Sequence, residues 1–340
     1  MSAPSIREIA RSLGLSHTTV SEALRESPRV NPVTRRRVQK AAKAVGYRPN
    51  PLAGALMSEM RRARSGTFRG LLAILDLDGP VSRPASSNRY HRELARGASA
   101  RAAELGFKAE TIVTGDLGIS HTRLDSILQA RGIRGLLVLP IAGEADLSSL
   151  DWSHFAGVYT DYLIERPALH SVCSDHYRSM VIAVQRLHSL GYRRLGLVLH
   201  SKNDARLLYR WEAAFHTYHE HHAQKEALPP LILPELDRQE FKRWFKAKRP
   251  DAVLCQRAEV MEWMEECGAR IPETHGFCCL NVTSNTASCA GLDLQPALLG
   301  ARGVELLIAA LHRNDCDVPE HPSTTTIPAL WVDGPTLRKG

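Results

Sequence analysis

The stretch that most constrains the fold is Ser5 to Leu24, SIREIARSLGLSHTTVSEAL, which predicts two short helices joined by a tight turn. Ser5 and Glu8 have the spacing of a capping box, in which each side chain satisfies a backbone amide at a helix start. Apolar residues then recur at helical spacing as far as Gly14, where a turn with positive φ is expected. The stretch therefore predicts a helix-turn-helix.

The second helix of this pair presents a small, polar face. Ser16 is its expected N-cap, and Val20 and Ala23 point inward. The residues left on the outer side are His17, Thr18, Ser21 and Glu22. A helix-turn-helix places the start of its second helix against base edges in the major groove of DNA. The alternative is an ordinary helical hairpin at the edge of a domain.

The distribution of charge favours the DNA-binding interpretation. Residues 1–64 hold 13 of the chain's 44 Lys and Arg but only four of its 36 Asp and Glu, whereas the remaining residues are close to neutral. Positive charge confined to one small segment is typical of phosphate contact.

Two further helices are expected before residue 66. Asn31 caps a third helix that has Pro32 at its first position and that ends at Gly46. Pro51 opens a short segment that Gly54 weakens, so this segment is expected to form a helix only when something holds it.

The rest of the chain alternates apolar strands with amphipathic helices. Strands are expected at 70–77, 107–113, 135–140, 155–160, 194–200, 251–256 and 276–281, with helices such as 90–105, 176–190 and 295–312 between them. Such alternation predicts parallel sheets with helices on both faces, and ligands bind beyond the carboxyl ends of such strands. The expected fold class is a small all-α head plus an α/β body.

Residues 5 to 57 resemble the DNA-binding head of the lactose-repressor (LacI/GalR) family of bacterial transcription regulators. The matching positions are Ile9-Ala10, Gly14-Leu15-Ser16, Thr19-Val20-Ser21, Arg29-Val30, Thr34-Arg35, Arg37-Val38, Gly46-Tyr47, Pro49-Asn50, Ala53 and Leu56. The resemblance extends more loosely to the C-terminus. It implies a two-lobed effector-binding body similar to periplasmic sugar-binding proteins.

The resemblance also assigns roles in DNA recognition. His17 and Thr18 match base-reading positions, and Leu56 matches a hinge leucine that wedges into the minor groove. The other positions expected at the DNA are Ser16, Ser21, Glu22, Arg29, Asn31, Thr34, Tyr47, Asn50 and Ala53. Glu22 stands where many members of the family have Arg. Its carboxylate can accept a hydrogen bond from cytosine N4, and the alternative is a solvated charge with no role in DNA recognition.

Candidate effector contacts lie near the strand ends of the body. Arg210 matches the family's effector-binding arginine, with a surface ion pair as the alternative. Gln256 and Asn281 each end a predicted strand, and Asn281 stands where most members have Asp. Tyr90 and Asp161 follow strands of the first lobe, where packing or helix capping is the alternative role.

The expected domains are a head at 1–49, a hinge helix and linker at 50–65, and an effector-binding and dimerisation domain at 66–340. Because the family's chain crosses between the lobes three times, lobe 1 is expected at 66–161 and 291–322, and lobe 2 at 162–290 and 323–340.

The sequence thus predicts a homodimeric transcription regulator, with repression as the favoured mode. Its partners would be a pseudo-palindromic DNA operator and a sugar-like small molecule. The alternatives are a sugar-binding module with no regulatory role on DNA, and a carbohydrate-active enzyme on the same sheets. A non-enzyme is favoured because no nucleophile elbow, P-loop or dinucleotide fingerprint follows a strand.

No cofactor or metal is expected. Seven cysteines are scattered without a Cys-x-x-Cys pair, and His216, His219, His221 and His222 lack a completing carboxylate or cysteine pattern. No apolar run approaches the roughly 20 residues of a membrane span, and the N-terminus lacks the apolar core of a signal peptide, so a cytoplasmic location is expected.

Overall fold

The structure is a computed structural model, which describes residues 6–24, 30–44, 69–81, 83–115, 118–143, 146–162, 166–221 and 228–339. The side chains of residues 6–8, 17, 18 and 21 are also outside the description. The chain divides into two compact units, Met1–Thr67 and Phe68–Gly340.

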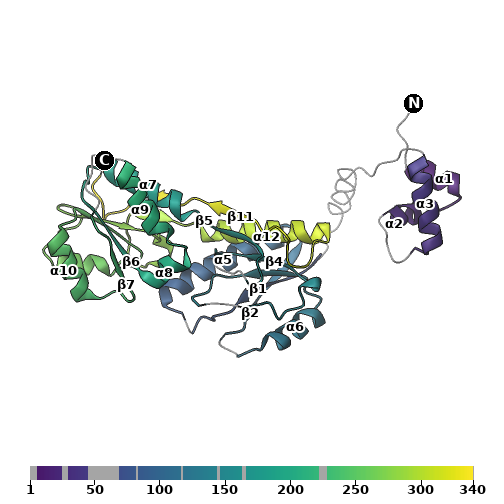
Figure 1. Ribbon diagram of the computed structural model, residues 1–340, viewed down its shortest axis with the longest axis horizontal. Coiled ribbons are helices and arrows are strands. Elements are labelled where there is room, and N and C mark those ends of the chain that lie inside the picture. Colours follow the sequence, from purple (N-terminus) through teal and green to yellow (C-terminus); the bar gives the residue numbers. More distant parts are fainter. Residues whose placement is uncertain are drawn as a thin grey trace. The chain divides into compact units, whose positions relative to one another are not determined.

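In its described residues the first unit has three helices, α1 (Ile6–Leu13), α2 (His17–Leu24) and α3 (Pro32–Ala44) (Figure 1). Gly14 has a φ of +66°, as the turn between α1 and α2 requires. Ser16 Oγ accepts from the Thr19 amide at 3.0 Å, and Asn31 Oδ1 accepts from the Val33 amide at 2.9 Å. The predicted turn and both predicted caps are confirmed. The buried core residues are Ile9, Ala10, Val20, Ala23, Val30, Val38 and Ala42.

The second unit contains two six-stranded sheets. The first has the order β11-β5-β4-β3-β1-β2, and all its pairs are parallel. Its strands are β1 (Gly70–Asp76), β2 (Phe107–Val113), β3 (Gly135–Val138), β4 (Ala156–Tyr159), β5 (His170–Ser174) and β11 (Thr324–Ile327).

The second sheet has the order β12-β10-β9-β8-β6-β7, and only β12 runs antiparallel to its neighbour. Its strands are β6 (Leu195–His200), β7 (Leu231–Leu233), β8 (Ala252–Cys255), β9 (Gly276–Cys279), β10 (Gly291–Asp293) and β12 (Leu330–Val332).

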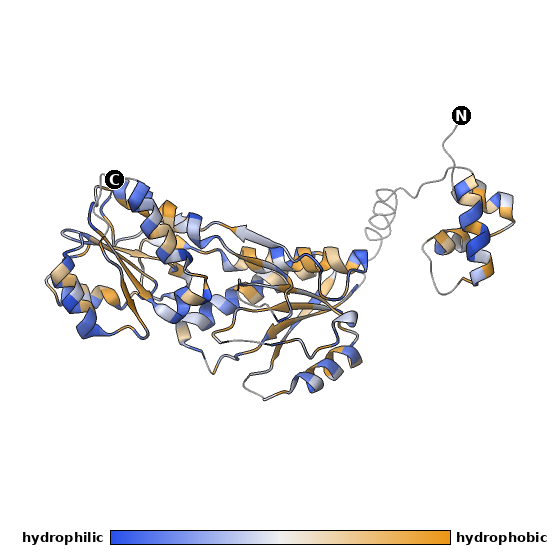
Figure 2. Cartoon of the chain, viewed as in Figure 1, coloured by the Kyte–Doolittle hydropathy of each residue, from blue (hydrophilic) through white to orange (hydrophobic). Residues whose placement is uncertain are grey.

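Helices cover both faces of each sheet. Against the first sheet pack α5 (Ala85–Glu104) and α12 (Pro296–Arg313) on one face and α6 (His121–Ala130) on the other. Against the second pack α7 (His176–Ser189) and α9 (Arg210–His221) on one face, and α10 (Arg238–Lys248) and α11 (Val260–Glu265) on the other. The remaining elements are α8 (Ser201–Arg206) and the 3₁₀ turns η1 (Trp152–His154) and η2 (Val282–Ser284). Figure 2 shows apolar strands inside these layers and hydrophilic outer faces on the helices. The predicted fold class is confirmed.

The assignment of segments to the two sheets differs from the prediction at three places. Strand β5, expected in lobe 2, pairs with β4 in the first sheet, and β11 pairs with β5 there. Strand β10, expected in lobe 1, pairs with β9 and β12 in the second sheet. The chain therefore passes between the sheets after β5, after β10 and after β11. These strands have only three to five residues, too few for a clear period of alternation.

No helix in the described ranges is long and apolar enough to cross a membrane.

The contact between α5 and α12 leads to a prediction about stability. A Cβ atom on Gly300 of α12 would lie 2.1 Å from the backbone oxygen of Leu94 in α5. The helices would have to separate, and overpacking of this kind costs about 1–3 kcal/mol. Gly300→Ala should therefore lower the free energy of unfolding by about 2 kcal/mol in urea denaturation, despite the better helix propensity of Ala.

Gly143→Ala is the matched control, because a Cβ atom there meets no atom within 4 Å. Equal stability of the two variants would contradict close packing of α5 on α12.

Candidate functional site

In the first unit, four residues expected at the DNA have described side chains. Ser16 and Asn31 are exposed, and both use their side-chain oxygens as helix caps. Glu22 and Thr34 are partly exposed, on α2 and α3. His17, Thr18 and Ser21 lie on α2, but their side chains are outside the description. The other expected residues, Arg29, Tyr47, Asn50, Ala53 and Leu56, lie outside the described residues. Their roles on DNA stay predictions.

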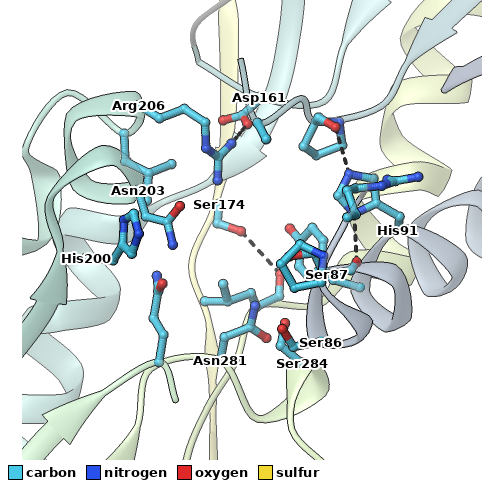
Figure 3. Close-up of a pocket in the computed structure, with 18 of the residues that line it drawn as sticks. Ser86, Ser87, His91, Asp161, Ser174, His200, Asn203, Arg206, Asn281 and Ser284 are labelled. Carbon is cyan, nitrogen blue, oxygen red and sulfur yellow. Dashed lines mark hydrogen bonds and ion pairs between the residues drawn. The ribbon is translucent and has the colours of Figure 1, made fainter. Parts of the chain in front are cut away.

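In the second unit, a cavity of about 320 Å³ lies at the carboxyl ends of strands from both sheets (Figure 3). Its lining follows β1, β3, β4 and β5 of the first sheet and β6, β7, β8, β9 and β10 of the second. Parallel strands bring the residues after their carboxyl ends to one edge, which is where α/β folds bind ligands. The start of α5 and two residues of α8, Asn203 and Arg206, complete the wall.

Four of the five expected effector residues line this cavity: Tyr90, Asp161, Gln256 and Asn281. Tyr90 is packed against the cores of both sheets, and burial raises its pKa to about 12. Asn281 Oδ1 is buried without a partner. Whether any of them binds a ligand stays a prediction.

Arg210, the fifth expected effector residue, does not line the cavity, whereas Arg206 does. Helix α8 ends at Arg206 and α9 begins at Arg210. Between them Leu208 and Tyr209 both have positive φ, which redirects the chain. The Arg210 guanidinium carbon lies 4.3 Å from the centroid of the Tyr162 ring instead.

The Arg206 guanidinium forms an ion pair with the carboxylate of Asp161 (Figure 3). Asp161 follows β4 of the first sheet, whereas Arg206 ends the helix after β6 of the second. A second hydrogen bond joins the same two halves, because Arg89 Nη1 donates to the backbone oxygen of Asn285 at 2.7 Å. The cavity is therefore spanned by polar contacts between the two sheets.

Sequence analysis missed the cavity residues at the start of α5. Arg83, Ser86, Ser87 and His91 all line the cavity. The His91 ring is held between two backbone oxygens, that of Ser87 at 2.8 Å and that of Pro140 at 2.7 Å. The available signal was the end of the predicted strand at 70–77, which β1 bears out, since a ligand-binding loop is expected just after such a strand.

Several buried polar atoms around the cavity have no hydrogen-bond partner. They are Arg83 Nη1, His176 Nδ1, His200 Nδ1 and Asn281 Oδ1. Burial lowers the pKa of His176 to about 3, so its ring is neutral at pH 7. Leaving such atoms unpaired costs about 1–3 kcal/mol each. Their concentration in one cavity indicates a binding site for a polar molecule.

Two histidines of α9, His216 and His219, have different surroundings. His219 is buried and its Nδ1 lies 2.7 Å from the Phe215 oxygen, whereas His216 is on the exposed side with Glu212 at 3.7 Å. His222 is outside the described residues. Across the described ranges, no three His, Cys, Asp or Glu residues are grouped so that they could hold a metal ion.

Asp204, on the helix that carries Arg206, gives a prediction about pH. Its side chain is 2% exposed, and only Oδ1 has a partner, the Trp211 amide at 3.2 Å. Burial raises the pKa of Asp204 to about 6, above the value of about 3.9 in an unfolded chain. The protonated form is favoured in the folded state, so stability is lost as pH rises from about 4 through 6.

Asp204→Asn removes this ionisation and can keep the bond to Trp211. The free energy of unfolding of the variant, minus that of the natural chain, should be about 1–2 kcal/mol larger at pH 7.5 than at pH 4. Urea denaturation at both pH values measures this difference. A stability difference that does not change with pH would contradict a raised pKa.

Comparisons with known proteins agree with both units. The model described as "Bacterial regulatory proteins, lacI family" matches residues 5–50, and that described as "Periplasmic binding protein-like domain" matches residues 184–335. The HTH-type transcriptional regulator CelR of Thermobifida fusca is 27% identical over 198 residues, which cover 57% of this chain and 55% of CelR. The HTH-type transcriptional repressor CytR of Escherichia coli (strain K12) is 26% identical over 201 residues, which cover 58% and 53%. The chain thus spans about half the length of these curated relatives.

Solved structures share the fold. A complex of the transcriptional regulator CelR with cellobiose superposes with a TM-score of 0.60 at 18% identity, covering 98% of this chain and 99% of that one. The lac repressor dimer bound to operator and the anti-inducer ONPF gives a TM-score of 0.54 at 16% identity, with 98% and 99% covered. Residues 5–50 thus resemble the lacI family of bacterial regulatory proteins, residues 184–335 resemble periplasmic binding proteins, and the solved structures share the fold of the chain.

Proposed function

We propose that this protein is a sequence-specific DNA-binding transcription regulator and that it acts as a repressor. Its affinity for its operator is controlled by a small polar molecule. The observation that carries the proposal is the cavity between the two sheets, with its unpartnered polar atoms, in a chain that also has a basic helix-turn-helix unit. We place its action in the bacterial cytoplasm, on DNA. The residues proposed at the effector are Arg206, Asp161, Gln256, Asn281 and Tyr90.

The ion pair between Asp161 and Arg206 suggests how the effector acts. A ligand that accepts hydrogen bonds from Arg206 competes with Asp161, which belongs to the other sheet. Ligand binding then changes the contacts between the sheets, and with them the angle between the lobes. Operator and effector affinities must change one another by the same factor, which corresponds to about 1–3 kcal/mol in typical allosteric proteins.

We propose that a homodimer carries this signal to DNA. A change in lobe angle alters the separation of the two hinge segments at 50–65, and so whether both can dock in the minor groove. Two heads related by a two-fold axis would read a pseudo-palindromic operator. The solved lac repressor that shares this fold is described as a dimer bound to operator.

Selection from a random pool of DNA duplexes, with the full-length chain at stated salt, tests the DNA-binding proposal. We expect a short palindrome with a flexible central step, because two major-groove readers flank a minor-groove wedge. Binding without any sequence preference would favour the alternative in which the body is a sugar-binding module. Turnover of a bound sugar would favour the enzyme instead.

His17 on α2 is expected to read bases, so His17→Ala should change the sequence recovered by that selection. Arg36 on α3 is exposed and is the matched control. Arg36→Ala removes a charge that reads no base, so it should weaken binding to all sequences alike and reduce the slope of affinity against salt by about 1. A change of preference in the Arg36 variant, or none in the His17 variant, would contradict these roles.

Leu56 is expected to act only on DNA. Leu56→Ala should lower operator affinity about tenfold or more by removing a wedge that unstacks a base step. In titration calorimetry without DNA, the variant should bind effector as the natural chain does. An unchanged operator affinity would rule out the hinge role.

A further inference from the structure

The first residues of α5 have backbone amides that make no hydrogen bond within the helix. The first helical hydrogen bond runs from the Asn88 amide to the Pro84 oxygen at 3.1 Å, so the amides of Ala85, Ser86 and Ser87 precede it. Pro84 occupies the N-cap position and supplies no side-chain cap. The helix is 20 residues long, and its dipole places partial positive charge at this end.

Two hydroxyls extend this donor set into the cavity. Ser86 and Ser87 both line it and are partly exposed there (Figure 3). Neither side chain makes a hydrogen bond to any residue in the described part of the chain. Both hydroxyls can therefore donate to a ligand.

Arg83 is an independent indication of a ligand at the same wall. Its side chain is only 3% exposed, and it forms an ion pair with Asp76 at the end of β1. Its Nε donates to the Gly79 oxygen at 3.2 Å, while Asp76 Oδ1 accepts from the Gly79 amide at 3.0 Å. These contacts fix the plane of the guanidinium. The third nitrogen, Nη1, is buried and has no partner.

The remaining charges of the cavity leave room for an anion. The carboxylates that line it in the described structure are Asp161 and Glu235. Asp161 is paired with Arg206, and Glu235 lies 3.3 Å from His200 with 83% of its side chain exposed. Asn281 ends β9 with a neutral amide where the resemblance led us to expect Asp. Among the described residues, every carboxylate that lines the cavity therefore has a basic neighbour, which favours an anion at the start of α5.

We propose that the effector carries an oxyanion, a phosphate or a carboxylate, bound at the start of α5 by Arg83, Ser86 and Ser87. The proposal rests on the cavity being the effector site, as proposed above. Elsewhere in the cavity, His176 Nδ1, His200 Nδ1 and Asn281 Oδ1 can accept hydrogen bonds from hydroxyl groups. The effector class is then a phosphorylated or carboxylated sugar.

Titration calorimetry on the full-length chain without DNA tests this subsite, with inorganic phosphate as the probe. Phosphate should bind to the natural chain. Ser86→Asp and Ser87→Asp place a carboxylate at the helix start, which stabilises a helix but repels an anion. Each variant should keep or raise the melting temperature and weaken phosphate binding at least tenfold.

Two further variants complete the test. Arg83→Lys can keep the ion pair with Asp76, but lysine has no counterpart of Arg83 Nη1. This variant should therefore also weaken phosphate binding at least tenfold. Asn203→Ala is the matched control, because Asn203 lines the same cavity from α8, on the side opposite the start of α5 (Figure 3). It should bind phosphate like the natural chain. Absence of phosphate binding, or phosphate binding that survives both aspartate variants, would overturn the proposal.

The affinities of charged and neutral sugars show whether the effector carries a phosphate ester or a carboxylate. Glucose 6-phosphate or glucuronate should bind more tightly than glucose, and the tighter of the two decides between phosphate ester and carboxylate. Glucose binding as tightly as both would overturn the proposal. All these measurements are made without DNA, so their outcome is separate from that of the operator selection.

Discussion

The larger unit depends on the parallel direction of its strands. In both sheets the strands that lead to the cavity run the same way, so the residues that follow them meet at one edge. Helices on both faces bury the strands, and polar groups can concentrate only beyond the strand ends. Two such edges facing one another produce a cavity whose walls belong to different sheets. Any ligand that contacts both walls must respond to their separation, and this couples binding to shape.

The apolar run around each strand decided how much of the fold could be predicted. Seven strands were recognised because they lie in runs of six to eight mostly apolar residues, and each lies within two residues of its expected start and end. The five that were missed have three to five residues, and β11, TTTI, is mostly exposed and carries no apolar signal. Their absence from the prediction also displaced the crossings between the lobes, because β5 joins the first sheet only through its pairing with β4.

The site was predictable where a side chain follows a strand that the sequence itself predicts. Asp161, Gln256 and Asn281 satisfy that rule after β4, β8 and β9, and all three line the cavity. The arginine that lines the cavity, Arg206, lies four residues before the Arg210 that the resemblance indicated. Between them Leu208 and Tyr209 have positive φ values, which no glycine or asparagine in this segment indicates. Arg83 was missed because its role comes from burial beside Asp76, seven residues away across a turn.

Of the three arginines that line the cavity in the described residues, Arg83, Arg206 and Arg257, the first two differ in how they are held. This difference suggests an order for the proposed events. Arg83 is fixed within its own sheet by Asp76 and Gly79, so it can orient a ligand without moving. Arg206 is held only by Asp161 of the opposite sheet, so a ligand that takes its hydrogen bonds releases a contact between the sheets. An effector anchored at Arg83 that also reaches Arg206 would thus exchange a contact between the lobes for one to itself. An effector that reached only Arg83 would bind without changing the lobe angle, and so would leave operator affinity unchanged.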